Sequence, residues 1–370
     1  MKKESDNTEK SVEKIFNEFK NKKLERVIKR ARWQTILRNI LISFLVFCVF
    51  SIAASYLINA YISRQRTASY GYIFAFNSIS APNKHTGIHV QQTAHASIRG
   101  QWSKTDYTTY KIIEGKVVYT GRIERESSPS FGNLLVHIGY PPIMDYNFST
   151  YEIEDFGYRR YNELGQRVMV FFYPFLIYDT NQSLNDLDLL DDIGNEKYME
   201  MALSFNREYT IEEVEKMLPE STTVTWYWVD DLSENEKEIS KIPRAERLEM
   251  EPPFVDMPDV RSEYSTYIDI PVVRSEYTAY GIKLYDNCGA KLSDPVGLFI
   301  RIIEVGKTAY KREDKLDNIY NNMAGDDGKL TQDDIRIWGA VVTGDSESLK
   351  ALIGLPFIEA SSIGVITDKY

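Results

Sequence analysis

Charge is absent from the 23 residues between Asn39 and Tyr61. About 20 apolar residues suffice for a helix to cross a hydrocarbon core roughly 30 Å thick, so this run predicts one transmembrane helix. Three alternatives fit less well: a cleaved signal peptide, a lipoprotein acylated on Cys48, and a buried core helix. The leader is long, the residue before Cys48 is the bulky Phe47, and the run is longer than a globular helix usually needs.

Lysine and arginine are scarce on one side of this span and concentrated on the other. Eight basic residues lie between Lys20 and Arg38, whereas Arg64 and Arg66 are the only ones between the span and Lys84. Because Lys and Arg near a span stay on the cytoplasmic face, we expect the N-terminus inside the cell and the C-terminal region outside. Residues 1–38 hold 12 basic and 6 acidic residues, but the whole chain carries −10, so the outer region is acidic.

Cysteine is also scarce. Cys48 falls in the span and Cys288 far along in the outer region, so we expect no disulfide within the chain. Secreted animal proteins commonly depend on disulfides. A large outer region without them is more typical of a Gram-positive bacterium.

Glycine, proline, histidine and cysteine are all missing from residues 11–38. Apolar residues recur there at three- and four-residue spacing, which predicts an amphipathic helix from Ser11 that continues into the span. So short a leader has no domain of its own against which to bury an apolar stripe, so the stripe must contact the membrane or a partner. The candidate partner-binding residues lie in the half far from the bilayer, at the spacing of helix-in-groove recognition: Val12, Ile15, Phe16 and Phe19.

Basic residues occupy the half of the leader nearer the span. Each favours anionic headgroups by about 1 kcal/mol when it lies near the surface. The candidate membrane-surface contacts are Lys22, Lys23, Arg26, Lys29, Arg30 and Arg32.

Beyond the span the sequence predicts an α+β fold in two parts. The domains we expect are a cytoplasmic helix (1–38), a transmembrane helix (39–61), a β-rich region (62–134) and an αβ domain (135–370). In the β-rich region, residues 108–113 and 116–122 flank Glu114-Gly115 and predict a hairpin, because glycine supplies the positive φ that a two-residue turn requires.

Two strand-helix-strand units are predicted in the αβ domain, which indicates one sheet with helices on one face. Thr210 and Glu213 form the pattern of a capping box at the start of one helix, and Pro295 opens another, expected over 296–320. The predicted strands are 167–172, 199–205, 222–229, 336–343 and 361–367, and the other predicted helix is 345–352.

The pentapeptide Val260–Tyr264 recurs as Val273–Tyr277, with a further tyrosine three residues after each copy. A local duplication that forms two strands at a sheet edge is the plainer interpretation. A tyrosine ladder that binds a ligand is the alternative.

Motifs for catalysis, metals and cofactors are absent or incomplete. Gly306-Lys307-Thr308 lacks the first glycine of a phosphate loop, and Ala360–Gly364 resembles a nucleophile elbow but precedes a predicted strand instead of a helix. The turn at 326–328 lacks the first ligand of a calcium loop, and Thr331 is better explained as a cap. His85, His89 and His95 have no helix or acidic partner around them, so we expect exposed strand and loop residues. We therefore predict no enzyme, no metal and no cofactor.

Several segments resemble the sigma factor regulator family. The resemblance to its C-terminal domain is carried by Val168–Tyr178, Ala202–Val214, Trp226–Asp230, Gly339–Gly344 and Pro356–Gly364, and Arg32-Trp33 running into a single span is similar to its N-terminal domain. The similarity covers residues 30–65 and roughly 135–370. It does not cover 66–134.

The resemblance implies a single-pass anti-sigma factor that holds an extracytoplasmic-function sigma factor at the membrane, with no direct contact to nucleic acid. Residues 1–38 lack His and Cys, so binding to sigma must be helical and free of metal. Release by an intramembrane protease and release by a second membrane protein, on an envelope stress signal, are both compatible with the sequence. The alternative function is a signal-anchored ligand-binding or cell-envelope protein without a sigma partner.

Overall fold

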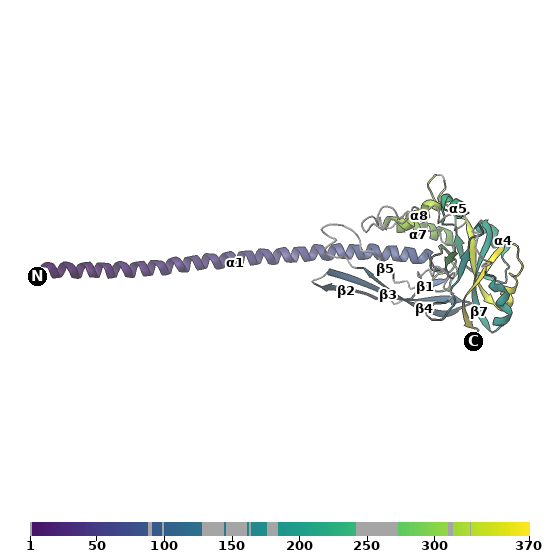
Figure 1. Cartoon of the computed structure of the whole chain (residues 1–370), viewed down its shortest axis with the longest axis horizontal. Coiled ribbons are helices and arrows are strands. Elements are labelled where there is room, and N and C mark those ends of the chain that lie inside the picture. Colours follow the sequence, from purple (N-terminus) through teal and green to yellow (C-terminus); the bar gives the residue numbers. More distant parts are fainter. Residues whose placement is uncertain are drawn as a thin grey trace, which may run out of the picture. The chain divides into compact units, whose positions relative to one another are not determined.

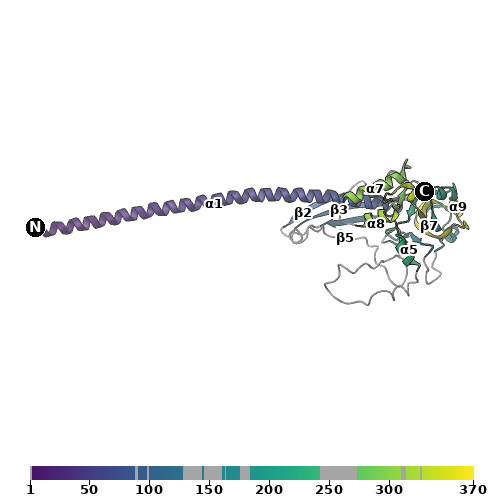
Figure 2. The ribbon, with the colours of Figure 1, turned by 90° about the horizontal axis from the view of Figure 1, so that it is seen from above.

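The computed structural model describes residues 2–87, 91–97, 100–127, 144–145, 161–162, 164–175, 184–241, 273–309, 314–325 and 327–370. The chain divides into two compact units, residues 1–65 and 66–370. The ribbon and its element labels are shown in Figures 1 and 2. The boundary predicted near 130–137 lies outside the described residues.

The first element, α1, is a single α-helix from Lys2 to Ile79. The prediction that the leader helix continues into the apolar run is confirmed, but its predicted start at Ser11 is wrong. No glycine occurs before Gly71 and no proline before Pro82, so nothing in the sequence interrupts the helix. The helix ends where Ala81 and Asn83 adopt the left-handed conformation, with φ of 57° and 53°.

An antiparallel sheet follows α1. Its strands are β1 (Lys84–Thr86), β2 (Gln91–Ser97), β3 (Gly100–Ile113), β4 (Lys116–Ser127) and β5 (Met144–Asp145). Strand β3 pairs with β1, β2 and β4. The predicted hairpin is confirmed, with longer strands, and both Glu114 and Gly115 have positive φ, as a two-residue hairpin turn of this kind requires.

The larger sheet has the order β10-β8-β11-β7-β12, and all neighbours are antiparallel. Helix α4 (Ile211–Met217) connects β7 (Lys197–Tyr209) to β8 (Thr223–Val229), and α9 (Ser346–Lys350) connects β11 (Ile337–Asp345) to β12 (Ile358–Asp368). Each unit has a strand of the other between its own two strands, which is the interleaved split βαβ arrangement of ferredoxin-like folds. The two predicted strand-helix-strand units are confirmed.

The chain between β8 and β11 adds α5 (Glu234–Ser240), β9 (Val273–Ser275), β10 (Gly281–Lys283), α7 (Pro295–Ala309), α8 (Asp314–Met323) and the 3-10 turn η2 (Gln332–Asp334). The single helix predicted over 296–320 is wrong, because α7 and α8 are separate helices that pack together. At Gly306 in α7, an added Cβ would lie 2.5 Å from Leu316 Cδ1 in α8. A larger residue at this position would have to displace the Leu316 side chain, so glycine favours this close approach of the two helices.

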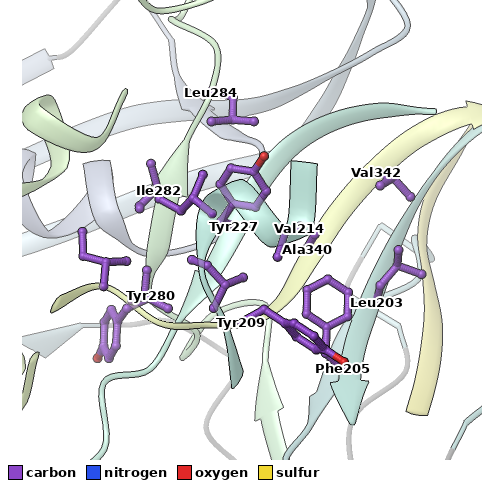
Figure 3. Close-up of a cluster of buried hydrophobic side chains, with 14 of the residues drawn as sticks. Leu203, Phe205, Tyr209, Val214, Tyr227, Tyr280, Ile282, Leu284, Ala340 and Val342 are labelled. Atoms are coloured by element: carbon purple, nitrogen blue, oxygen red, sulfur yellow. The ribbon is translucent and has the colours of Figure 1, made fainter. Parts of the chain in front are cut away.

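Side chains along β7 alternate between two cores. Met201, Leu203 and Phe205 belong to the cluster that contains α4, α7, α8 and α9, part of which is shown in Figure 3. Ala202 faces the opposite side with Trp226, Trp228 and other aromatic residues. Helices therefore cover one face of the sheet, as predicted.

The opposite face is covered by non-helical chain. Strand β6 (Val170–Phe172) pairs with β9, and Ser204 Oγ and Ser362 Oγ accept hydrogen bonds from its backbone N–H groups. The apolar strand predicted over 167–172 is thus confirmed in its second half. Before β7, the 3-10 turn η1 (Asp186–Leu189) lies beside β12, where Asp186 accepts the backbone N–H of Ile363. Helix α3 (Leu190–Ile193) follows η1, and the backbone oxygen of Leu190 accepts a hydrogen bond from Ser346 Oγ in α9.

Candidate functional site

The candidate partner-binding stripe is exposed on α1. The exposed fractions are 57% for Ile15, 75% for Phe16 and 74% for Phe19. The side chain of Val12 is outside the described residues, although its backbone is helical. Three large apolar side chains in water are a feature of interaction surfaces rather than of an isolated soluble helix.

All six candidate membrane-surface residues are exposed on the same helix, after the stripe: Lys22, Lys23, Arg26, Lys29, Arg30 and Arg32. Their positions let both the long apolar stems and the charged ends reach a surface alongside the helix. The structure contains no lipid or partner, so these assignments remain predictions.

The apolar run of α1 contains large exposed side chains on every side of the helix, among them Leu41, Phe44, Leu45 and Phe47. A helix that is hydrophobic all round must be covered by protein or by lipid. Among the described residues, one helical stretch, Lys14–Leu57, is long and apolar enough to contain a membrane span, and its most apolar window is not buried by protein. This stretch is a candidate membrane anchor.

We call the unit of residues 66–370 the outer unit, after the orientation predicted from the sequence. It contains a buried charge cluster that the sequence did not reveal. Lys111 Nζ on β3 lies 2.5 Å from Glu200 Oε1 on β7 and 3.0 Å from Glu276 Oε2, just after β9. All three side chains are nearly inaccessible to solvent. The cluster therefore ties the hairpin of the first sheet to both layers of the second.

Backbone N–H groups donate further hydrogen bonds to the two carboxylates. Glu200 Oε1 accepts the N–H of Val365, and Glu276 Oε2 accepts the N–H of Met169. Burial raises the pKa of Glu200, and Lys111 offsets part of that shift. Burial alone would lower the pKa of Lys111, but the two carboxylates raise it above its ordinary value, which keeps the ammonium charged.

Gly364 makes room for Glu200. The register between β12 and β7 shifts between Ile363 and Ile366, and this irregularity frees the N–H of Val365 to bond the carboxylate. A Cβ at Gly364 would lie 2.6 Å from Glu200 Cγ and Oε1. The segment Ala360–Gly364 thus serves to seat a buried carboxylate. Ser361 lies within a strand, as predicted, and not at the turn into a helix that a nucleophile elbow requires.

A second buried pair lies in the aromatic core. Arg274 Nη2 bonds Asp231 Oδ2 at 2.9 Å, and Arg274 Nε donates to the Tyr173 hydroxyl at 3.0 Å. Burial would lower the pKa of Arg274, but Asp231 and Tyr173 raise it. Lys111 and Arg274 are therefore each paired with at least one buried carboxylate.

The second copy of the repeated pentapeptide supplies both clusters. Its first three residues form β9, its Arg274 pairs with Asp231, and its Glu276 pairs with Lys111. The strand interpretation is confirmed for this copy, and its charged residues are structural. The first copy, Val260–Tyr264, lies outside the described residues.

Two of the incomplete motifs lie in helical elements, α7 and η2. Gly306 and Lys307 lie inside α7, and Lys307 Nζ lies 3.4 Å from the Tyr320 ring centroid. Thr331 and Asp334 form a capping box at η2, as predicted. Cys48 and Cys288 are free.

The prediction of exposed histidines is wrong for His85. It is 3% exposed on β1 and stacks on Tyr110, and its Nδ1 lies 3.1 Å from Asn287 Oδ1. His89 lies outside the described residues, and only the backbone of His95 is described, in β2. Within the described part of the chain, no three His, Cys, Asp or Glu side chains are grouped to hold a metal ion.

Comparison with protein families gives two matches. Residues 25–118 match the family described as sigma factor regulator N-terminal, and residues 190–292 and 299–365 match sigma factor regulator C-terminal. The N-terminal match extends through the span to the hairpin, so the expectation that 66–134 has no counterpart is corrected for 66–118. No curated protein and no solved structure matches the chain.

Proposed function

Because the chain belongs to the sigma factor regulator family, we propose that it is a membrane-anchored anti-sigma factor that sequesters an extracytoplasmic-function sigma factor through the N-terminal part of α1. The anti-sigma role and the sigma partner come with the family, which is regulatory and not enzymatic. The class of sigma factor, the binding residues and the route of release are our proposal.

The observation that carries the proposal is the exposed stripe of Ile15, Phe16 and Phe19. These residues precede the family match, which begins at residue 25. The proposed binding element therefore lies outside the part of the chain that the family model covers. In the complex, the aromatic side chains would enter an apolar groove on sigma and be removed from water, as anchors of a helix-in-groove contact are.

The basic residues between the stripe and the span support an inside N-terminus. Lys and Arg are retained on the cytoplasmic side of a span, where the anionic leaflet attracts them. In this orientation the stripe is in the cytoplasm with the sigma factor, and residues 66–370 are outside and receive the envelope signal. Release then follows when an intramembrane protease or a second membrane protein separates or distorts the helix.

The test is co-purification of the tagged full-length protein from its native membrane. Phe16→Asp/Phe19→Asp places two charges in the apolar contact, and we expect it to lose the sigma factor and raise transcription of the sigma regulon. Leu24→Asp is the matched control, because Leu24 is also exposed on α1, but the 3.6-residue period directs it to a different side of the helix.

Recovery of the sigma factor with Leu24→Asp and not with the double variant supports the stripe. Equal loss in both variants contradicts the assignment of the binding face. If the wild-type protein recovers no sigma factor, the anti-sigma proposal fails, and a surface ligand-binding or envelope protein becomes the better description.

A further inference from the structure

The last turns of α1 are embedded in the outer unit. Ala75 and Ile79 are buried in the core on the helical side of the larger sheet. Phe76 packs edge-on against Tyr280, with ring centroids 5.7 Å apart, and Ser80 forms a bridge to Tyr280. The helix end is therefore part of this domain's core.

A lysine completes this attachment. Lys283, at the end of β10, donates from Nζ to the backbone oxygen of Asn77 at 3.0 Å and to that of Lys84 at 2.8 Å. Asn77 in turn donates from Nδ2 to the Tyr107 hydroxyl at 2.6 Å. We call Lys283 with these two carbonyl oxygens the α1 clamp.

The α1 clamp provides hydrogen-bond donors for carbonyl groups at the end of α1. The last four carbonyls of an α-helix have no partner within the helix, and a cation near them also interacts favourably with the helix dipole. Lys283 supplies N–H donors to these carbonyls in either protonation state, at the point where α1 stops and β1 begins, and meets the second need only when it is charged. A change at this lysine thus acts directly on the end of the membrane helix.

Burial, together with the like charge of Lys84, makes the proton of Lys283 labile. Lys84 and His85 face it from β1, and Tyr107 borders it from β3 through Asn77. Asp286 faces His85. Lys283 itself forms no ion pair within the described residues, so only carbonyl oxygens hold its charge. Burial, reinforced by Lys84, lowers the pKa of Lys283 to about 7.

We propose that Lys283 is a positioning residue that fixes the outer end of α1 in the domain, and that the protonation of its amine sets how firmly the end is held. External protons, or a ligand that changes the charge at this junction, would then alter the end of the helix whose other end carries the partner-binding stripe. Only this last step, the effect on the partner, rests on the proposed function.

The direction follows from the affinity of Lys283 for its proton. The amine binds a proton less readily in the folded site than in water. Protonation therefore favours the state in which the helix end is open. Opening of the helix end should therefore become easier as the pH falls from about 10 to about 7. Below about 7 the dependence should level off, because the amine is then charged in both states.

The test is hydrogen exchange of the backbone amides of residues 74–84 in the full-length protein in lipid nanodiscs. Exchange is normalised to the intrinsic rate at each pH between 6.5 and 9.5. For the wild type we expect the opening equilibrium to rise by about tenfold or more between pH 9 and pH 7, the scale that a lysine of this kind gives by linkage.

Three variants separate a positioning role from general packing. Lys283→Met removes the donors, so its exchange should be faster at pH 9 and no longer depend on pH beyond the intrinsic rate. Lys283→Arg keeps donors and a permanent charge, so protection should partly return without the pH dependence. Lys84→Met removes the like charge but leaves its backbone carbonyl in place, and should shift the levelling-off to higher pH.

A pH-independent wild type, or Lys283→Met with unchanged exchange, would overturn the α1 clamp. The same holds if Lys84→Met leaves the pH profile in place. This measurement does not involve the partner, so it decides the role of Lys283 even if co-purification shows no sigma factor. If a sigma factor is recovered, a sigma-dependent reporter should also respond to Lys283→Met and not to Leu24→Asp.

Discussion

The two units of the chain place apolar and charged residues in opposite ways. In residues 1–65 the large apolar side chains that the structure describes are exposed, from Phe16 in the stripe to Phe50 in the predicted span. In residues 66–370 many of the described apolar side chains form buried cores, and charged residues such as Lys111 and Glu200 are buried with them. We therefore expect lipid and a partner to cover the first unit, whereas the second pairs its buried charges with one another.

The largest expected effect comes from separating the buried charges. Lys111→Met leaves Glu200 and Glu276 buried without their cation, and breaking such a cluster by removing one partner costs about 3–5 kcal/mol. The free energy of unfolding of the outer unit should fall by that amount. Denaturant unfolding of the full-length protein in detergent, followed by fluorescence of the buried Trp226, Trp228 and Trp338, measures it.

Two controls keep this prediction specific. Lys197→Met breaks the exposed pair with Asp368 and should change the unfolding free energy by at most about 1 kcal/mol. Phe16→Ser alters only the exposed stripe and should leave the transition of the outer unit unchanged. A loss as large for Lys197→Met as for Lys111→Met would show that burial of the charges is not the cause.

The next effect in size is a dependence on pH. Burial, together with the nearby Lys283, lowers the pKa of His85 to about 4, from 6.5 for an unperturbed histidine. Between these values the unfolded chain binds a proton that the folded protein does not, so stability decreases as the pH falls from about 6.5 to about 4. The full difference is about 3 kcal/mol.

His85→Phe tests this prediction, because phenylalanine retains a ring against Tyr110 but cannot titrate. Urea unfolding between pH 7 and pH 4 should show a smaller loss of stability in the variant than in the wild type. The opening of α1 that Lys283 controls changes above pH 7, so the two effects occupy different pH ranges. An unchanged acid slope in His85→Phe would assign the loss to other groups.

The sequence revealed those features of the fold that are determined by residues close together in the chain. The span followed from missing charge, the hairpin at Glu114-Gly115 from turn chemistry, and α4 from its capping box. That α7 and α8 are two helices could not be read, because no glycine or proline occurs between Lys307 and Tyr320, and the contact between Gly306 and Leu316 joins two separate elements. The start of α1 at Lys2 was missed because the residues before Ser11 are polar and show no apolar period.

The buried cluster was missed for a stronger reason. Lys111 lies 89 residues from Glu200 and 165 from Glu276 in the sequence, so no local pattern connects them. In isolation Lys111 has the appearance of a solvent-exposed residue of a hairpin. One signal was available: Glu200 interrupts an otherwise apolar strand, where a charge without a buried partner would be costly.

The smallest expected effect concerns a feature that the sequence did reveal. Thr210 Oγ1 accepts the N–H of Glu213 at 3.3 Å, and Glu213 Oε2 accepts the N–H of Thr210 at 2.8 Å. Thr210→Ala should reduce the unfolding free energy by about 1 kcal/mol, because a helix start loses its cap, and Thr210→Ser should retain most of it. The same denaturant transition measures both variants, and a loss near that of Lys111→Met would contradict the comparison. If Lys111→Met is indeed more destabilising than Thr210→Ala, the local motifs that can be recognised in this sequence contribute less to stability than the contacts between residues far apart in it.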